Sequence, residues 1–181
     1  MKFDASQHRC TIVINDQLSP GLAMNAASVI GISFGRTVEN LVGPDLQSAD
    51  GVNYPGVIYA PLPVLLAGDD YVQQLLHIAS EDEEIYAMPF SALAQSCRTY
   101  EEYGERISPV NSQQIELVAI GPIGPKKKIS RLSGYLPPSK WVRGAARPAP
   151  PFRPTPGRRS PATSGRFPRW SSPRSASFLR P

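Results

Sequence analysis

Residues 11–34 constrain the fold most, because a short β-branched run there is followed at once by a helical apolar pattern. Thr11–Ile14 predicts an interior strand that is covered on both faces. Ser19 and Pro20 then favour a helix start, since Ser can cap a backbone N–H and Pro loses no hydrogen bond at the first helical position. Apolar residues at three- and four-residue spacing continue this helix: Leu22, Ala26, Val29, Ile30 and Phe34. A strand that leads directly into a helix favours an α/β fold.

The sequence up to residue 138 goes on alternating between strand and helix patterns after a polar lead-in over 1–9. Strands are predicted over 56–63, 85–88 and 115–120, and helices over 69–80, 91–95, 99–107 and 126–134. Prolines weaken the far end of the strand over 56–63, because proline cannot donate to a ladder. A turn is predicted at Asp50-Gly51, and Gly121-Pro122 is predicted to end the last strand. Strands separated by helices predict a three-layer α/β/α sandwich.

Charge and proline divide the chain into two parts. Residues 1–139 carry 9 Lys/Arg against 15 Asp/Glu, a net charge of −6, whereas residues 140–181 carry 10 Lys/Arg and no acid. Nine of the 20 prolines also fall in the second part, which has no apolar periodicity that could build a core. We therefore predict one α/β domain over 1–138 and a disordered basic tail over 139–181. The tail is either a natural extension or a frameshift product, and it is expected to contact nucleic acid without sequence specificity.

Several kinds of site and compartment are not indicated by the sequence. Cys10 and Cys97 lack the number and spacing of a disulfide framework or a zinc site, so both are expected to be buried thiols. The acidic run Glu81–Glu84 is interpreted as a solvated helix end, because adjacent carboxylates do not share one face. We therefore expect no metal and no cofactor. No apolar run approaches a membrane span, so a cytoplasmic protein without membrane contact is expected.

Three separated groups of residues carry a resemblance to a known family. They are Ile12–Ile14, Leu18, Gly21, Ala23 and Asn25–Ala27; then Ala94, Gln95, Arg98–Tyr100 and Tyr103; then Gly121, Pro122, Ile129, Leu132, Gly134, Leu136 and Pro137. Together they resemble the domain-of-unknown-function family numbered 2000, over roughly residues 10–138. More distantly, residues 117–122 followed by 129–136 are similar to type II peptidyl-tRNA hydrolases. The resemblance implies a small mixed four-stranded sheet sandwiched by helices.

The resemblance also implies a site where the first strand passes into the first helix. Backbone N–H groups of Gly21 and Leu22 would point out of a helix N-terminus, a position suited to an anion. Asn25 lies one turn further on, and its amide either contacts a ligand or makes an interhelical or helix–loop hydrogen bond. Ser19 is interpreted mainly as a helix cap.

A second stretch is expected to line the same cleft. Arg98 and Thr99 align with an Arg-Thr pair of the hydrolases, and Arg98 could hold a carboxylate or phosphate with two hydrogen bonds. The equally open alternative is an ion pair with Asp16, Glu101 or Glu102. Gln95 stands where the hydrolases carry an acidic residue, and residues 19–22 stand where they carry basic ones.

Two functions remain open from the sequence. The first is non-hydrolytic binding of a small anionic ligand or a protein partner at the first strand–helix turn, with these candidate ligand-binding residues: Ser19, Gly21, Asn25, Gln95, Arg98 and Thr99. The alternative is a hydrolase of peptidyl-tRNA, or of another ester or amide, with a rearranged active site. A hydrolase needs a proton acceptor, and Asp16 is the one carboxylate near the turn. No catalytic residue is assigned. The sequence leaves open whether the protein forms a homodimer.

Overall fold

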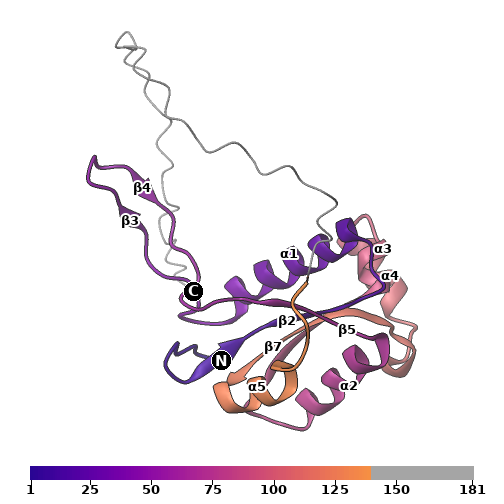
Figure 1. The fold of residues 1–181 in the computed structure, drawn as a ribbon. Coiled ribbons are helices and arrows are strands. Elements are labelled where there is room, and N and C mark those ends of the chain that lie inside the picture. The colour runs from indigo at the N-terminus through magenta and orange to yellow at the C-terminus, as the bar shows by residue number, and fades with distance from the viewer. Residues whose placement is uncertain (140–181) are drawn as a thin grey trace, which may run out of the picture. The chain divides into compact units, whose positions relative to one another are not determined.

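In the computed structural model, which describes residues 1–139, strands and helices alternate along the chain (Figure 1). The elements are β1 (His8–Cys10), β2 (Ile12–Asn15), α1 (Pro20–Thr37), β3 (Leu46–Gln47), β4 (Asn53–Tyr54), β5 (Val64–Ala67), α2 (Asp69–Ser80), β6 (Tyr86–Ser91), α3 (Ala92–Ser96), α4 (Tyr100–Ile107), a 3₁₀ helix (Ser112–Gln114), β7 (Leu117–Pro125) and α5 (Lys126–Ser133). The predicted α/β class is confirmed. The tail predicted over 139–181 lies outside the described residues, apart from Ser139.

The long strand β7 is the centre of a mixed sheet. On one side β7 pairs antiparallel with β6, and on the other it pairs antiparallel with β1 and then β2, in succession along its length. β5 pairs parallel with β2 at the far edge. β1 and β2 share one side of β7, so the order across the sheet is β6, β7, then β1 and β2, then β5. The sheet is mixed as expected, but the expected number of four strands is wrong, because the chain breaks at Thr11 and forms two strands, β1 and β2, along β7. Residues 137–139 then cover the outer edge of β5, where Ser139 N donates to Val64 O.

Helices cover both faces of this sheet (Figure 1). The side chains of Ala26, Ile30 and Phe34 from α1 are fully buried against one face. Val72 and Leu75 of α2 and Ile129 of α5 are buried against the other. Successive side chains of β2 point to opposite faces, so Ile12 and Ile14 are buried in one core and Val13 in the other, which explains the continuous apolar sequence of this strand. The result is a helix, sheet and helix in three layers.

The strand predicted over 56–63 is wrong, because the sheet begins only at Val64. Pro61 and Pro63 have no N–H to give to a ladder, and only the Pro63 carbonyl takes part, by accepting from Ile12 N at 2.9 Å. The preceding residues form a separate ribbon in which β3 pairs with β4. The predicted turn is present between these strands, with Gly51 at φ 85°. The polar lead-in over 1–9 is also corrected, because β1 begins at His8.

The prediction that Gly121-Pro122 ends the last strand is wrong as well, since β7 runs through to Pro125. The Pro122 carbonyl accepts from Thr11 N at 3.2 Å, at the break between β1 and β2. At Gly121 an added Cβ would collide with the Phe34 ring and lie 2.6 Å from Cγ2 of Ile30. Glycine is therefore required there by the close approach of α1 to the sheet, whereas the same dipeptide in isolation indicates a turn.

The helix boundaries agree more closely with the sequence patterns. α2 spans Asp69–Ser80 as predicted, and its two acidic residues at the start suit the positive end of a helix. α1 begins after Ser19 as predicted, but the Ser19 side chain makes no capping hydrogen bond. No helix among residues 1–139 is long and apolar enough to cross a membrane.

The acidic run after α2 is tied to α5 and is not simply solvated. Nζ of Lys128 lies 2.6 Å from Oδ2 of Asp82 and 2.5 Å from Oε2 of Glu84. The hydrogen bond from Lys128 lowers the pKa of Asp82, and the same contacts raise the pKa of Lys128. This ion-pair group fixes the N-terminal turn of α5 against the loop that leads into β6.

Replacing Lys128 by methionine should lower stability in a pH-dependent way. A depressed Asp82 pKa stabilises the fold above the ordinary value of 3.8, and that contribution disappears as pH falls through the folded-state pKa. The raised Lys128 pKa contributes below 10.5 and is lost as pH rises through its folded-state value. We expect the urea midpoint of Lys128→Met to lie below wild type at neutral pH and to approach it as pH falls through the lowered folded-state pKa of Asp82. Lys127→Met, which removes an exposed lysine without an ion pair among residues 1–139, is the control; a pH-independent difference for Lys128→Met would contradict the assignment.

Candidate functional site

The turn between β2 and α1 is held by the side chain of Asn15. Its Oδ1 accepts from Gln17 N at 2.9 Å, and its Nδ2 donates to Oδ1 of Asp69 at 3.1 Å. The Asp16 N–H donates to the carbonyl of Ala67 at 2.9 Å. The turn is therefore anchored to the start of α2, and it gives α1 a fixed starting point.

The first turn of α1 presents free backbone donors. Within residues 1–139 no acceptor contacts the N–H groups of Gly21 or Leu22, whereas Ala23 N bonds to Ser19 O at 2.9 Å. The first turn contains no acidic residue, and the Ser19 side chain does not cap it. No acidic residue of the first turn and no acceptor among residues 1–139 therefore offsets the partial positive charge of this helix end.

Gln95 joins α3 to the first turns of α1. Its Nε2 donates to the carbonyl of Leu22 at 3.0 Å and to Oδ1 of Asn25 at 3.2 Å. Of the two alternatives given for the Asn25 amide, a ligand contact or an interhelical hydrogen bond, the structure shows the interhelical hydrogen bond. Oδ1 of Asn25 is engaged, while its Nδ2 has no acceptor within residues 1–139. Two of the candidate residues, 70 positions apart in the chain, are brought together here.

Arg98 and Thr99 follow α3, and their roles differ. Oγ1 of Thr99 accepts from Glu102 N at 3.1 Å, so this side chain caps α4. The Arg98 backbone N–H donates to Oε2 of Glu102 at 2.9 Å, while the Glu102 carboxylate pairs with Arg106 at 3.2 Å. These bonds lower the pKa of Glu102. The exposed Arg98 guanidinium makes no ion pair within residues 1–139, so the expected pairing with Asp16, Glu101 or Glu102 is not found.

The carboxylate nearest to the turn is not placed as a proton acceptor for a bound group. Asp16 is exposed, and its Oδ1 accepts from Nε2 of the neighbouring Gln17 at 2.7 Å. Among residues 1–139 no group of three His, Cys, Asp or Glu side chains could hold a metal ion. The turn therefore offers several hydrogen-bond donors and no positioned base.

The two cysteines differ in environment. Cys10 is fully buried, and burial raises the pKa of its thiol. Cys97 is only half-buried, which corrects the expectation that both would be buried. Its Sγ donates to the Leu93 carbonyl at 3.2 Å, and Nη1 of Arg106 lies 3.6 Å from the sulfur. The rings of Tyr100 and Tyr103, both on α4, lie edge to face with their centroids 6.1 Å apart.

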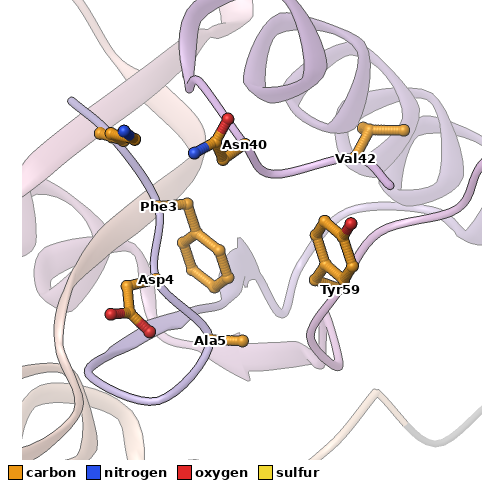
Figure 2. A pocket seen from close by; sticks show the side chains of 7 residues that line it. Phe3, Asp4, Ala5, Asn40, Val42 and Tyr59 are labelled. Atoms are coloured by element: carbon orange, nitrogen blue, oxygen red, sulfur yellow. The ribbon is translucent and has the colours of Figure 1, made fainter. Parts of the chain in front are cut away.

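Two cavities were not indicated by the sequence. One of about 450 Å³ lies beside α1 and is lined mainly by Ile14, Ala23, Met24, Ala27, Ser28, Val64 and Ser139. The other, of about 690 Å³, is a broad hollow near the N-terminus, where Phe3 lies between Asn40, Val42 and Tyr59 (Figure 2). Asn40 has a φ of 59°, a left-handed conformation that asparagine tolerates better than most residues. Neither cavity includes Arg98, Gln95 or Asn25.

Comparisons with known proteins place the chain in a group without an assigned activity. Residues 8–140 match the family described as "Protein of unknown function (DUF2000)". The structure of a protein of unknown function from Agrobacterium tumefaciens superposes with a TM-score of 0.61 at 11% identity, covering 74% of this chain and 98% of that chain. At this identity the likeness shows the fold alone. No curated protein matches the sequence.

Proposed function

The chain belongs to the DUF2000 family, and we propose that it is a non-hydrolytic binding protein that holds a small anionic ligand at the first turn of α1. The observation that carries this proposal is the positive end of α1, where the N–H groups of Gly21 and Leu22 have no acceptor among residues 1–139 and the first turn contains no acidic residue. We further propose that the domain has the fold of the type II peptidyl-tRNA hydrolases, because residues 117–122 and 129–136 are similar to a segment of those enzymes.

The side chains around this helix end supply further donors. Nδ2 of Asn25 is free within residues 1–139, and the Gln95 hydrogen bonds fix the position of α3 beside it. Arg98 follows three residues after Gln95 and carries an exposed guanidinium without an ion pair in the described residues. A guanidinium and backbone N–H groups are suited to carboxylate or phosphate oxygens. In a part of the chain with a net charge of −6, backbone N–H groups and a guanidinium available to an anion are a distinct electrostatic feature.

Substitution of the two side-chain donors should weaken anion binding while the fold is kept. We expect Arg98→Ala to raise the dissociation constant about tenfold or more, and Asn25→Ala to raise it about threefold to tenfold, since a hydrogen bond to a charged group contributes more than a neutral one. The measurement is an NMR titration of the full chain with inorganic phosphate and with acetate, following the amide signals of Gly21 and Leu22.

The matched control is Arg36→Ala, which removes a cation from the opposite end of α1 and should leave the titration unchanged. A wild-type protein whose Gly21 and Leu22 signals do not move with either anion would contradict the proposal. Equal weakening by Arg36→Ala and Arg98→Ala would show only a general effect of net charge.

A protein partner is a second candidate occupant of the same turn. The observation that favours it is apolar exposure: Leu22 is 46% exposed and Met24 is 54% exposed, directly beside the donors. A partner would cover these side chains, whereas a small anion would not. Replacing Leu22 by serine therefore separates the two, because it should leave phosphate binding unchanged and weaken only a partner that covers the apolar surface.

A further inference from the structure

The outer face of α1 is unusual for a surface helix. From Pro20 to Gly35 the helix contains no charged residue, and the first charge is Arg36 in its last turn. Exposed positions on this face are Gly21, Met24, Asn25, Ser28, Ile32 and Gly35. Ile32 is 75% exposed, and Met24 is 54% exposed. A helix whose outer face meets only water normally carries charged residues there, so this face is suited to contact with protein.

We propose that this face is the interface of a two-fold symmetric homodimer, in which α1 packs antiparallel against α1 of a second copy. The sequence of the face is symmetric about Ser28, which lies near the middle of the helix. With Ser28 on the two-fold axis, Met24 lies opposite Ile32 of the second copy and Gly21 lies opposite Gly35. The face is therefore complementary to itself, as an isologous contact requires.

The residue sizes suit a close helix pair. Gly21, Ser28 and Gly35 recur every seven residues and leave room for a second backbone, while Met24 and Ile32 project between them. An added Cβ at Gly21 would meet no atom of its own chain within 4 Å. The absence of a side chain there is thus not explained by packing inside the domain, and the proposed neighbour accounts for it.

The uncharged outer face of α1 limits the repulsion between two copies. Residues 1–139 carry a net charge of −6, so two copies repel each other, and a contact through an uncharged face brings no acidic side chains together. In the antiparallel arrangement Arg36 lies near the turn that precedes the second copy's α1, where Asp16 is exposed. The two helix dipoles also run in opposite directions, so each positive end lies near a negative one.

The ribbon that follows α1 enlarges the interface. An 18-residue helix is only about 27 Å long, whereas a stable interface usually buries about 800 Å² on each partner. Residues 41–60, which we call the arm, extend beyond the C-terminal end of α1 and away from the sheet (Figure 1). Exposed apolar side chains cluster on the arm: Val42, Leu46, Val52, Tyr54, Val57 and Tyr59. In the antiparallel dimer each arm lies beside the start of the other copy's α1 and can contact Met24.

Sedimentation of the full chain over a range of concentrations tests this proposal. Wild type should sediment as a dimer of about twice 19.7 kDa. Ile32→Glu should raise the dimer dissociation constant more than about 100-fold, because it buries two unpaired carboxylates. The control is Tyr100→Glu, since Tyr100 is 83% exposed and lies outside the interface; it should remain dimeric.

A cross-linking experiment tests the position of the axis directly. Ser28→Cys should form an intermolecular disulfide on mild oxidation, because the two side chains face each other at the axis. Ser6→Cys, at an exposed position far from α1 in the sequence, should not. A wild type that is still monomeric at about 100 µM overturns the proposal. So does a dimer that survives Ile32→Glu, because that dimer uses another surface.

Discussion

Phe34→Ala is expected to lower the free energy of unfolding by about 3–5 kcal/mol, the usual loss when a fully buried phenylalanine is truncated. Phe34 is 0% exposed and lies between α1 and β7, where its ring also contacts that of Tyr86 at a centroid distance of 6.4 Å. Truncation leaves a cavity opposite Gly121, a residue that has no side chain to fill it. Urea unfolding followed by circular dichroism measures the loss.

The same contact predicts an interaction between two substitutions. Gly121→Ala alone should cost about 1–3 kcal/mol, because its Cβ collides with Phe34 and Ile30. In the Phe34→Ala background the ring is gone, so Gly121→Ala should cost less than it does in wild type. A double-mutant cycle reports this difference as a coupling energy. Additive effects would show that Phe34 and Gly121 do not share a contact.

Tyr100→Ala serves as the control for these stability measurements. It truncates an aromatic side chain that is 83% exposed and lies outside the proposed dimer interface. It should change stability by no more than about 0.5 kcal/mol. A loss similar to that of Phe34→Ala would mean that burial does not distinguish these two aromatic side chains.

The full chain is not expected to hydrolyse peptidyl-tRNA. Gln95 replaces the acidic residue of the hydrolase pattern, and residues 19–22 replace its basic ones with uncharged residues. Loss of one preorganised electrostatic group commonly costs about 10²–10³ in rate, and here several are missing from one step. We expect cleavage at the uncatalysed rate in an assay with labelled peptidyl-tRNA.

Two variants make this result decisive. Gln95→Glu should not create activity, because glutamate cannot donate to the Leu22 carbonyl and would loosen α3 from α1. Cleavage by the wild type that disappears in Asp16→Asn would instead support the alternative, a hydrolase with a rearranged active site. An active wild type would also require the Asp16 side chain to leave its hydrogen bond with Gln17.

The elements predicted correctly are those whose sequence patterns, such as apolar periodicity and helix-start residues, span only a few neighbouring residues. The span of α2 follows from apolar periodicity and from Asp69 and Asp70 at its start. Local reasoning failed where a distant contact decides the conformation. Gly121-Pro122 indicates a turn by itself, but Phe34 of α1 requires a glycine within a continuous strand. β5 begins at Val64, after the strand predicted over 56–63, because the prolines before Val64 cannot donate hydrogen bonds to a ladder.

The site was predicted as a set of residues, without the contacts between them. Asn25 and Gln95 were both named, yet the bond between them depends on how α3 packs beside α1. Thr99 was named as a ligand candidate because Arg98 and Thr99 align with an Arg-Thr pair of the hydrolases, and only the position of α4 shows that the Thr99 hydroxyl caps a helix. Both outcomes depend on tertiary packing, which spacing in one sequence does not determine.

The central place of β7 has a consequence for synthesis of the protein. β7 is the last strand of the chain, yet β1, β2 and β6 all form hydrogen bonds with it. While the ribosome is still making residues 117–125, these earlier strands lack their common neighbour, and β2 has only β5 to pair with. The sheet can therefore be completed only after translation has passed β7, and until then apolar side chains of the earlier strands are less fully covered.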